Sequence, residues 1–333
     1  MKKRALCVGI DAYPGSPLTG CVNDASAIAE VLRKNEDGSP NFTVETLLGQ
    51  SAADDISRPT LRSALARLFD NSRDKTLLFY FAGHGAKTPW GTELVTQDAV
   101  RDSLGVSVND ILVLANSSAA LSITIILDCC FSGDLGNLTG LQEESTSEQF
   151  RIGRAILRDG VTILAASSPT ETSDENDGHG LFTRILIDGL EGGASDHLGA
   201  ITTLGLFGHA ASSFDAWQQT PVLKTNVTTP TVLRTGPPWL DPNLLRDLPK
   251  HFPTEAHQLQ LTPAHEGDGR PLPAGTTGSP EQQQFDYLGR LRNANLVTSD
   301  GKRDHYWLAM ESGCVYLTPL GRYFWRLAAK GVL

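Results

Sequence analysis

The chain has little of what marks a secreted, membrane-bound or nucleic-acid-binding protein. Only five of its 333 residues are cysteines, and two of them, Cys129 and Cys130, are adjacent, which fits a reducing compartment better than a disulfide framework. Basic residues are outnumbered by acidic ones, 28 to 38, so the net charge of −10 gives no general attraction to nucleic acid or anionic lipid. The apolar run 5–10 ends at Asp11, too early for a signal peptide, and polar residues interrupt the longer stretch 111–131. We therefore expect a cytoplasmic protein with no membrane segment.

Short apolar runs alternate with helical patterns along the first two-thirds of the chain. This alternation is typical of an α/β fold with a largely parallel sheet flanked by helices. The predicted strands are 4–10, 43–48, 76–82, 123–128 and 161–167, with a last strand near 222–224 or 231–234. The predicted helices are 22–35, 60–71, 107–116 and 180–189. The continuous apolar sequences 77–81 and 123–127 predict central strands that are covered on both faces.

The composition changes after Thr235. Nine of the 18 prolines fall in 235–284, which predicts an extended linker. We expect this linker to span 235–280 and to be packed in part through the apolar side chains of Trp239, Leu244, Leu245 and Phe252.

Regular patterns resume at residue 281. They predict a helix over 282–296, two strands at 306–310 and 315–317, and a last helix that starts at Pro319. This order of helix, hairpin and helix resembles a winged-helix domain. The predicted organisation is an α/β domain over 1–234, a proline-rich linker over 235–280 and a small α+β winged-helix-like domain over 281–333.

Two of the predicted central strands end in chemically reactive residues. The first runs into His84, which glycines flank on both sides, and the second runs into Asp128, Cys129 and Cys130. Binding and catalytic sites in open α/β sheets form at the carboxyl ends of strands, so His84 and a cysteine can meet there. A free thiol titrates near about pH 8.5 and needs a neighbouring base to be a good nucleophile. The pair predicts a Cys-His nucleophilic site.

The motifs YFAGHG (80–85) and ILDCCFSGD (126–134) resemble those of the caspase-like cysteine peptidases, specifically the bacterial metacaspase-like branch. Two further segments match that branch: ALCVGIDAY with LTGCVNDA near the start, and AASSPTETSDE with GLFTRIL near residue 180. The resemblance covers about residues 1–234 and implies a caspase-like fold.

The resemblance also implies catalytic roles. His84 corresponds to the general base and acid, and Cys130 to the nucleophile. The backbone N–H groups of Gly85 and Cys130 would form the oxyanion hole. A redox role for the adjacent cysteines Cys129 and Cys130 is an alternative, although a disulfide between neighbours is strained.

Three residues fall on positions that line the specificity pocket of metacaspases: Cys21, Asp24 and Asp128. Acidic walls favour an arginine or lysine side chain before the scissile bond. The family often has serine two residues before the histidine, where this chain has Ala82, so one pocket hydroxyl is missing. The alternatives are a charge at a helix N-terminus for Asp24 and an ordinary strand-end carboxylate for Asp128.

Calcium is a further expectation that comes from the resemblance. Many metacaspases bind this ion through oxygen ligands. The candidates here are Asp98, Asn109 and Asp110, with Asp134 or Asn137 after the nucleophile. The usual dense acidic loop is missing, so solvated surface charge is the alternative, and no cofactor is required.

The segment 134–160 contains Arg151, Arg154 and Arg158. Cleavage after one of these arginines would be self-processing or activation, and a basic surface helix is the alternative.

The sequence thus predicts a cysteine endopeptidase that acts on proteins or peptides after arginine or lysine, controlled by processing or by an activating protein partner. Caspase-like proteases in bacteria are often associated with conflict or programmed-death systems, which implies a role in bacterial defence. The alternatives are a regulator that binds nucleic acid or protein through the C-terminal domain, and a catalytically silent adaptor. Residues 281–333 carry seven basic and five acidic side chains, a surplus too small to favour nucleic acid.

Overall fold

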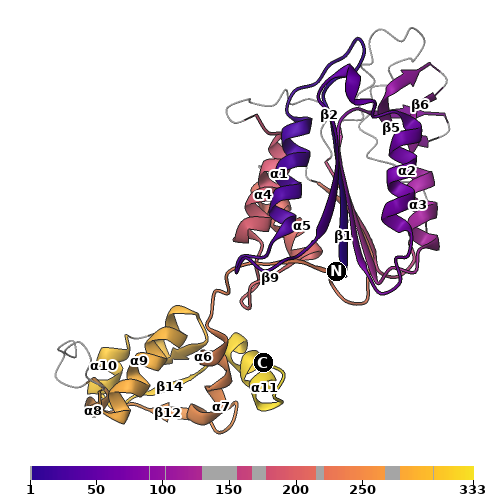
Figure 1. Ribbon diagram of the computed structural model, residues 1–333. Coiled ribbons are helices and arrows are strands. Elements are labelled where there is room, and N and C mark those ends of the chain that lie inside the picture. The colour runs from indigo at the N-terminus through magenta and orange to yellow at the C-terminus, as the bar shows by residue number, and fades with distance from the viewer. Residues whose placement is uncertain are drawn as a thin grey trace. The chain divides into compact units, whose positions relative to one another are not determined.

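A six-stranded sheet with the order β10-β8-β7-β3-β1-β2 forms the centre of the first part of the chain (Figure 1). Its strands are β1 (Lys3–Ile10), β2 (Thr43–Gly49), β3 (Thr76–Ala82), β7 (Ser122–Asp128), β8 (Val161–Ala165) and β10 (Val222–Asn226). Strand β10 pairs antiparallel with β8, and the other neighbours are parallel, which confirms the predicted α/β class. The computed structural model describes residues 2–89, 91–101, 103–129, 156–166, 178–214, 221–266, 278–302 and 304–333.

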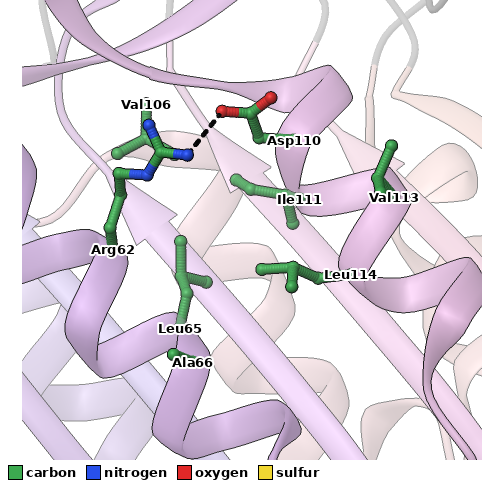
Figure 2. A pocket seen from close by; sticks show the side chains of 8 residues that line it. All are labelled: Arg62, Leu65, Ala66, Val106, Asp110, Ile111, Val113 and Leu114. Carbon is green, nitrogen blue, oxygen red and sulfur yellow. Dashed lines mark ion pairs between the residues drawn. The ribbon is translucent and has the colours of Figure 1, made fainter.

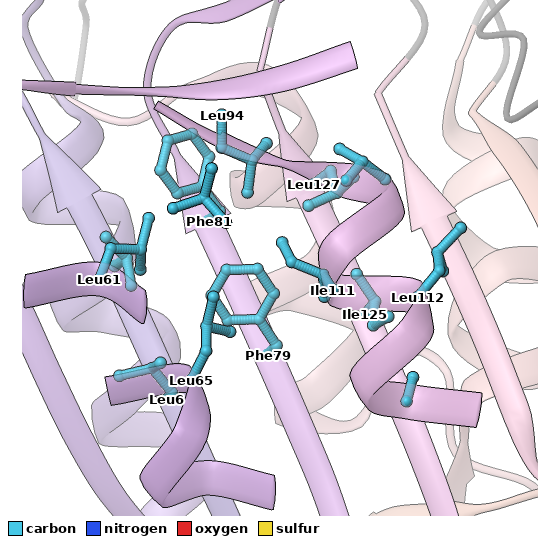
Figure 3. Packing of buried hydrophobic residues seen from close by; sticks show 14 of the residues in the cluster. Leu6, Leu61, Leu65, Phe79, Phe81, Leu94, Ile111, Leu112, Ile125 and Leu127 are labelled. Atoms are coloured by element: carbon cyan, nitrogen blue, oxygen red, sulfur yellow. The ribbon is translucent and has the colours of Figure 1, made fainter. Parts of the chain in front are cut away.

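Helices cover both faces of this sheet (Figure 1). On one face lie α1 (Cys21–Arg33), α4 (Leu181–Asp188), which continues into the π-helical turn η2 (Gly189–Gly193), and α5 (Thr203–Ser213); on the other lie α2 (Arg58–Phe69) and α3 (Val108–Ser117). A hydrophobic core lies on each face of the sheet, and successive side chains of β3 point alternately into one and the other. Phe79 and Phe81 pack with α2 and α3 (Figure 3), whereas Leu78 and Tyr80 pack with the opposite helices. A strand buried on both faces explains its unbroken apolar sequence.

Two small sheets accompany the central one. Directly after His84, β4 (Gly85–Thr88), β5 (Gly91–Val100) and β6 (Ser103–Ser107) form an antiparallel sheet that the sequence patterns do not predict. Strand β9 (Ala200–Thr202) pairs with β11 (Val232–Thr235), so both candidate positions for the last strand form strands. A short 3-10 helix, η1 (Ala52–Asp54), follows β2.

The proline-rich segment is not a separate linker. The chain divides into the units Met1–Pro237 and Pro238–Leu333, and the second unit includes most of the expected linker. Its first elements are α6 (Pro242–Arg246), α7 (Leu248–His251), β12 (Gln258–Gln260) and α8 (Pro263–Glu266). Leu245 and Phe252 are fully buried against Leu288 and Leu291. The prolines start these short helices, where their missing N–H groups cost nothing.

The rest of the second unit consists of α9 (Pro280–Asn293), β13 (Val297–Ser299), η3 (Asp300–Lys302), α10 (His305–Met310), β14 (Cys314–Leu317) and α11 (Pro319–Ala329). Its antiparallel sheet has the order β12-β14-β13. The strand predicted at 306–310 is wrong, because that segment is helix α10. Asp304 caps this helix, and Leu308 and Ala309 are buried while Tyr306 and Trp307 are exposed, which is helical spacing.

Candidate active site

His84 lies just beyond the carboxyl end of β3. Gly83 joins it to the strand and donates its N–H to the carbonyl of Asp128, 3.3 Å away on the neighbouring strand β7. A Cβ atom on Gly83 would lie 2.4 Å from the hydroxyl oxygen of Tyr13, so a larger residue does not fit here. The backbone of Gly83, and with it the start of the His84 segment, is thus tied to the end of β7.

The imidazole of His84 is fixed by two neighbouring residues. Its Nε2 lies 2.8 Å from the backbone carbonyl oxygen of Ser16 and 3.3 Å from the Ser16 hydroxyl. The hydroxyl of Tyr13 accepts the backbone N–H of His84 (3.1 Å) and donates to the carbonyl of Val95 (3.2 Å). Burial lowers the pKa of His84 below its ordinary value. The ring is therefore neutral near pH 7, as a general base must be.

The register of two parallel strands aligns the two reactive motifs. Ala82 at the end of β3 pairs directly with Asp128 at the end of β7. His84 and Cys130 each come two residues after this pair in the sequence. Gly85, the other predicted oxyanion-hole residue, is buried at the start of β4. Cys130 lies outside the described residues, and the neighbouring Cys129 is buried.

The three predicted pocket residues come together beside these strand ends. Asp24 is only 3% exposed in the first turn of α1, and Asp128 ends β7. A Cβ atom built on Gly180 would be 3.2 Å from Asp24 Oδ2 and 3.5 Å from Asp128 Oδ2. Both carboxylates therefore lie next to the same position beside Gly180. Cys21 opens helix α1 and donates its N–H to Asp11 (2.9 Å). The arrangement is a cluster of acids, not a set of separate surface charges.

Helix α4 and the residues before it supply the hydrogen bonds to both carboxylates. His179 Nδ1 donates to Asp24 Oδ1 (2.7 Å), and the N–H of Gly180 lies 3.3 Å from each oxygen of Asp24. Thr183 donates to Asp128 Oδ2 (2.5 Å), and the buried hydroxyl of Tyr80 lies 2.5 Å from Thr183 Oγ1. Both acids are thus oriented by the α4 region.

Burial and mutual repulsion shape the titration of this cluster. Desolvation, and next the charge of Asp128, raise the pKa of Asp24 to about 7. Burial also raises the pKa of Asp128, against the hydrogen bonds from Thr183 and Tyr80. Burial and the nearby carboxylates raise the pKa of Cys21 well above its usual range, so this thiol stays protonated. The cluster is short of positive charge.

The candidate calcium ligands are used in other contacts. Asp98 accepts hydrogen bonds from the backbone N–H of Arg58 and the hydroxyl of Thr96. Asp110 forms an ion pair with Arg62 (3.4 Å). The backbone N–H of Asn109 donates to the side chain of Ser107, which caps the N-terminus of α3. Across the described ranges, no three His, Cys, Asp or Glu side chains are grouped closely enough to hold a metal ion.

The Arg62–Asp110 pair borders a cavity of about 350 Å³ on the α2/α3 side of the sheet (Figure 2). Its other lining residues are all apolar: Leu65, Ala66, Val106, Ile111, Val113 and Leu114. The cavity contains neither His84 nor the acid cluster.

Of the three candidate processing arginines, Arg151 and Arg154 lie outside the described residues. Arg158 is anchored: its guanidinium donates to the carbonyls of Ala115 (3.0 Å) and Ala120 (2.8 Å) around the end of α3. Asn116 holds the same segment by accepting the N–H of Arg158 (3.0 Å). Cleavage after Arg158 stays a prediction, and it would first require these hydrogen bonds to break.

Comparison with known families agrees with this geometry. The sequence model of the caspase domain family matches residues 2–231. The chain belongs to the caspase domain family. Membership supports cysteine peptidase activity and protein or peptide substrates. The fold class predicted from the motifs is confirmed for this caspase domain.

Two solved structures are similar to the chain. One is a protein from Geobacter sulfurreducens, with 16% identity and a TM-score of 0.48, covering 72% of this chain and 98% of that one. The other is caspase-1 from Spodoptera frugiperda, with 14% identity and a TM-score of 0.46, covering 71% of this chain and 90% of that one. A search of curated proteins finds no match.

Sequence patterns alone missed several residues of the caspase domain site. Tyr13 and Ser16 contact His84, and His179, Thr183 and Tyr80 order the acids. One signal was available for Tyr80, since a tyrosine within a fully buried strand needs a partner for its hydroxyl. As for membrane association, the described helices include none long and apolar enough to span a bilayer.

Proposed function

We propose that this caspase domain is a cysteine endopeptidase with a Cys130–His84 dyad that cleaves peptide bonds after arginine or lysine. The observation that carries the proposal is the pairing of Ala82 with Asp128, because the two reactive residues each follow this pair by two positions. Adjacent parallel strands that end together bring the residues after them to one edge of the sheet.

The chemistry follows from the orientation of His84. A carbonyl oxygen only accepts hydrogen bonds, so the contact with Ser16 requires the proton on Nε2 and leaves Nδ1 as the basic nitrogen. Nδ1 takes the thiol proton of Cys130, and the thiolate attacks the scissile carbonyl carbon. The N–H groups of Gly85 and Cys130 stabilise the oxyanion. His84 then passes the proton to the leaving amine, and water, deprotonated by the same nitrogen, releases the acyl group from the sulfur.

The acid cluster supports the choice of substrate. The carboxylates of the buried Asp24 and the half-buried Asp128 lie next to the same position, with Cys21 beside them as a neutral thiol. A buried carboxylate pair without a full counter-charge favours a cationic side chain strongly, since an opposite charge offsets the desolvation of both acids. A guanidinium can bridge two carboxylates through its fork of donors, whereas an ammonium is a point charge. The cluster would therefore bind arginine more tightly than lysine.

The proposal is tested with the full chain and fluorogenic peptides that differ only in the residue before the scissile bond: arginine, lysine, citrulline and aspartate. Citrulline has the shape of arginine without its charge. We expect cleavage after arginine and lysine only, and its loss in both Cys130→Ala and His84→Ala. Each assay is run with added calcium and with a chelator, because a calcium site that includes Asp98, Asn109 and Asp110 remains a proposal. Cleavage after aspartate alone, or unchanged activity of Cys130→Ala, would overturn the dyad or the specificity.

Exposed side chains of the second unit support a second role for this protein, the binding of an activating protein partner. Helix α10 exposes Tyr306, Trp307 and Met310 by 41, 58 and 47%, and the Tyr306 and Trp307 rings meet edge to face. Aromatic and methionine side chains are enriched at protein interfaces. Residues 238–333 carry ten basic and ten acidic side chains, and this balance disfavours nucleic acid.

The architecture of this unit also supports a winged-helix-like domain, since α8 and α9 lie in sequence between β12 and β13, and β14 pairs with both of those strands. Gel-shift experiments with duplex DNA and RNA at about 0.1 M salt separate the two partners. Binding that weakens steeply with salt would favour nucleic acid. Absence of binding, with a Trp307→Ala chain that keeps peptidase activity but loses activation in cell extract, would favour a protein.

A further inference from the structure

Asp24 has one titratable hydrogen-bond partner among the described residues, His179. The two side chains are 2.7 Å apart between Nδ1 and Oδ1, although 155 residues separate them in the chain. The carboxylate side chain is 5% exposed and the imidazole side chain 27%, so the imidazole lies between the buried acid and solvent. The N–H of Gly180 holds the same carboxylate from the start of α4.

The groups that surround this pair are acidic. The charge of Asp128 on β7 raises the pKa of Asp24. The charges of both carboxylates also raise the pKa of Cys21 on α1 and of Tyr80 on β3. Asp11, in the loop after β1, acts on Cys21. Of all these groups, His179 alone can become positively charged.

The buried carboxylate of Asp24 and the half-buried carboxylate of Asp128 lie too close together for both to remain charged at low cost. Either a cation must be near or one proton must be taken up. The geometry offers that proton two adjacent positions, the Asp24 carboxyl and the His179 imidazole, which share one hydrogen bond. The raised pKa of Asp24, about 7, agrees with uptake near neutrality.

We propose that Asp24 and His179 together hold one proton while the specificity pocket is empty, and that an arginine or lysine side chain displaces this proton when it binds. The inference rests on the proposed function, because it requires the cation to enter this cluster. In the exchange one N–H or O–H bond of the pair breaks, the proton passes to the buffer, and the substrate cation replaces its charge. His179 is a specificity-determining residue that shares this proton and so sets the pH range over which the substrate cation binds.

The exchange has a quantitative consequence. Where the empty pair holds its proton, affinity for an arginine side chain changes about tenfold per pH unit, because one proton is released per ligand bound. Above the titration of the pair the affinity is constant. A neutral side chain displaces no proton and shows neither effect.

The test is calorimetric and needs no catalysis. The full-length Cys130→Ala chain is titrated with an acetylated tetrapeptide ending in argininamide, in two buffers of different ionisation enthalpy, at pH 6 and pH 8. We expect release of close to one proton per bound peptide at pH 6 and close to none at pH 8. The matched peptide ending in citrullinamide should bind at least about tenfold more weakly and release none. Tight arginine binding with no proton released at pH 6 would overturn the inference and leave the proposed function standing.

A substitution then assigns the proton to the pair. His179→Asn in the Cys130→Ala chain keeps an N–H donor for Asp24 but removes the imidazole. We expect its pH-dependent range to move to higher pH, because Asp24 loses the favourable charge of the imidazole, so that arginine affinity at pH 7.5 falls below that of the parent. An unchanged pH dependence would contradict a role for His179. If the variant misfolds by circular dichroism, the proton count of the parent still decides. No preference for arginine over citrulline at either pH would overturn the proposed specificity itself.

Discussion

The Nε2 atom of His84 lies 2.8 Å from the backbone carbonyl oxygen of Ser16. This contact fixes the tautomer of the ring without a second side chain, because a carbonyl cannot donate. The acid residue that many nucleophilic sites use to orient their histidine is replaced here by the chain itself. His84 is also partly desolvated, which favours its neutral form.

The first prediction concerns the pH dependence of turnover. Burial lowers the pKa of His84, so the basic form persists below the ordinary value of about 6.5 and is lost only as pH falls through the lowered value. With saturating arginine substrate, kcat should be constant from pH 8 down to about 6.5 and then fall. The KM should rise over a different range, near pH 7, where the Asp24–His179 pair takes up its proton. A fall in kcat that is complete above pH 7 would contradict the role given to His84.

The second prediction concerns Tyr13, whose hydroxyl links the backbone of His84 to that of Val95. Tyr13→Phe keeps the ring but leaves a buried N–H and a carbonyl without this partner, which should lower the unfolding free energy by about 1–3 kcal/mol. Because the lost hydroxyl accepts the backbone N–H of His84, the position of the imidazole is less well fixed, and kcat should fall more than KM changes. Urea unfolding and steady-state kinetics check both effects. Tyr323→Phe, at a 53% exposed position, is the control and should change neither.

The third prediction uses the glycine between the two acids. Gly180 has φ −65° and ψ 143°, which alanine adopts without strain, so Gly180→Ala changes the space and not the backbone. Its methyl group would lie 3.2 Å from Asp24 Oδ2 and 3.5 Å from Asp128 Oδ2. We expect KM for an arginine peptide to rise at least about tenfold, through loss of about 1.4 kcal/mol of binding, with a smaller change for lysine.

Gly208→Ala is the matched control for this variant, because a Cβ there meets nothing within 4 Å and the position lies in helix α5. It should leave KM unchanged and stabilise the chain slightly, as alanine does within helices. A Gly180→Ala chain with wild-type KM for arginine would place the substrate cation elsewhere.

Much of this site was predictable from local sequence patterns. The buried strands β3 and β7 have unbroken apolar sequences, and the residues that follow them carry the reactive groups. The contact between Asp24 and His179 was not predictable in this way, since a hydrogen bond across 155 residues leaves no periodic trace. The same holds for Thr183 on α4, whose hydroxyl donates to Asp128 at the end of β7, 55 residues away in the chain.

The failed secondary-structure predictions have local causes. In β5, Leu94, Val95 and Thr96 are all buried, so the strand lacks the alternation that identifies a half-buried hairpin. The short apolar run at 306–310 fits either a strand or a helix, and the Asp304 cap decides for the helix. The prolines of 238–263 suggested a linker by composition, but leucines between them supply part of a core.

The fourth prediction separates the candidate processing arginines. Arg158 binds backbone carbonyls at the end of α3, where a cation also interacts favourably with the helix dipole. Arg158→Ala should destabilise the chain by about 1–2 kcal/mol, since the group is partly exposed, and leave any self-cleavage pattern unchanged. Arg33→Ala, which removes an exposed ion pair with Glu30, should cost less than about 0.5 kcal/mol. Mass spectrometry of fragments from the Arg151→Ala/Arg154→Ala chain completes the comparison, and persistent cleavage after Arg158 would contradict it.

The last prediction concerns the second unit, where the Gln284 amide links two histidines. Gln284 Nε2 donates to His251 Nδ1 (3.1 Å), and Gln284 Oε1 accepts from His265 Nε2 (3.1 Å). His265 Nδ1 in turn accepts the N–H of Thr262. Protonation of His251 at Nδ1 would break its hydrogen bond with Gln284. Burial lowers the pKa of His251, and it lowers that of His305, whose Nδ1 is buried without a partner.

The sign of the effect follows from linkage. The unfolded chain protonates His251 and His305 near about pH 6.5, before the folded chain does, so their stabilising contribution is present above that pH and is lost as pH falls through the lowered values. Hydrogen exchange of the full chain should therefore show peptides from 248–266 and 280–293 losing protection between pH 7 and 5, after correction for intrinsic exchange rates. Gln284→Glu is the informative variant, because a carboxylate cannot donate to His251 and favours its protonated form. Its second unit should lose less stability on acidification than that of the parent chain, and a greater loss would show that the amide network does not set this pH dependence.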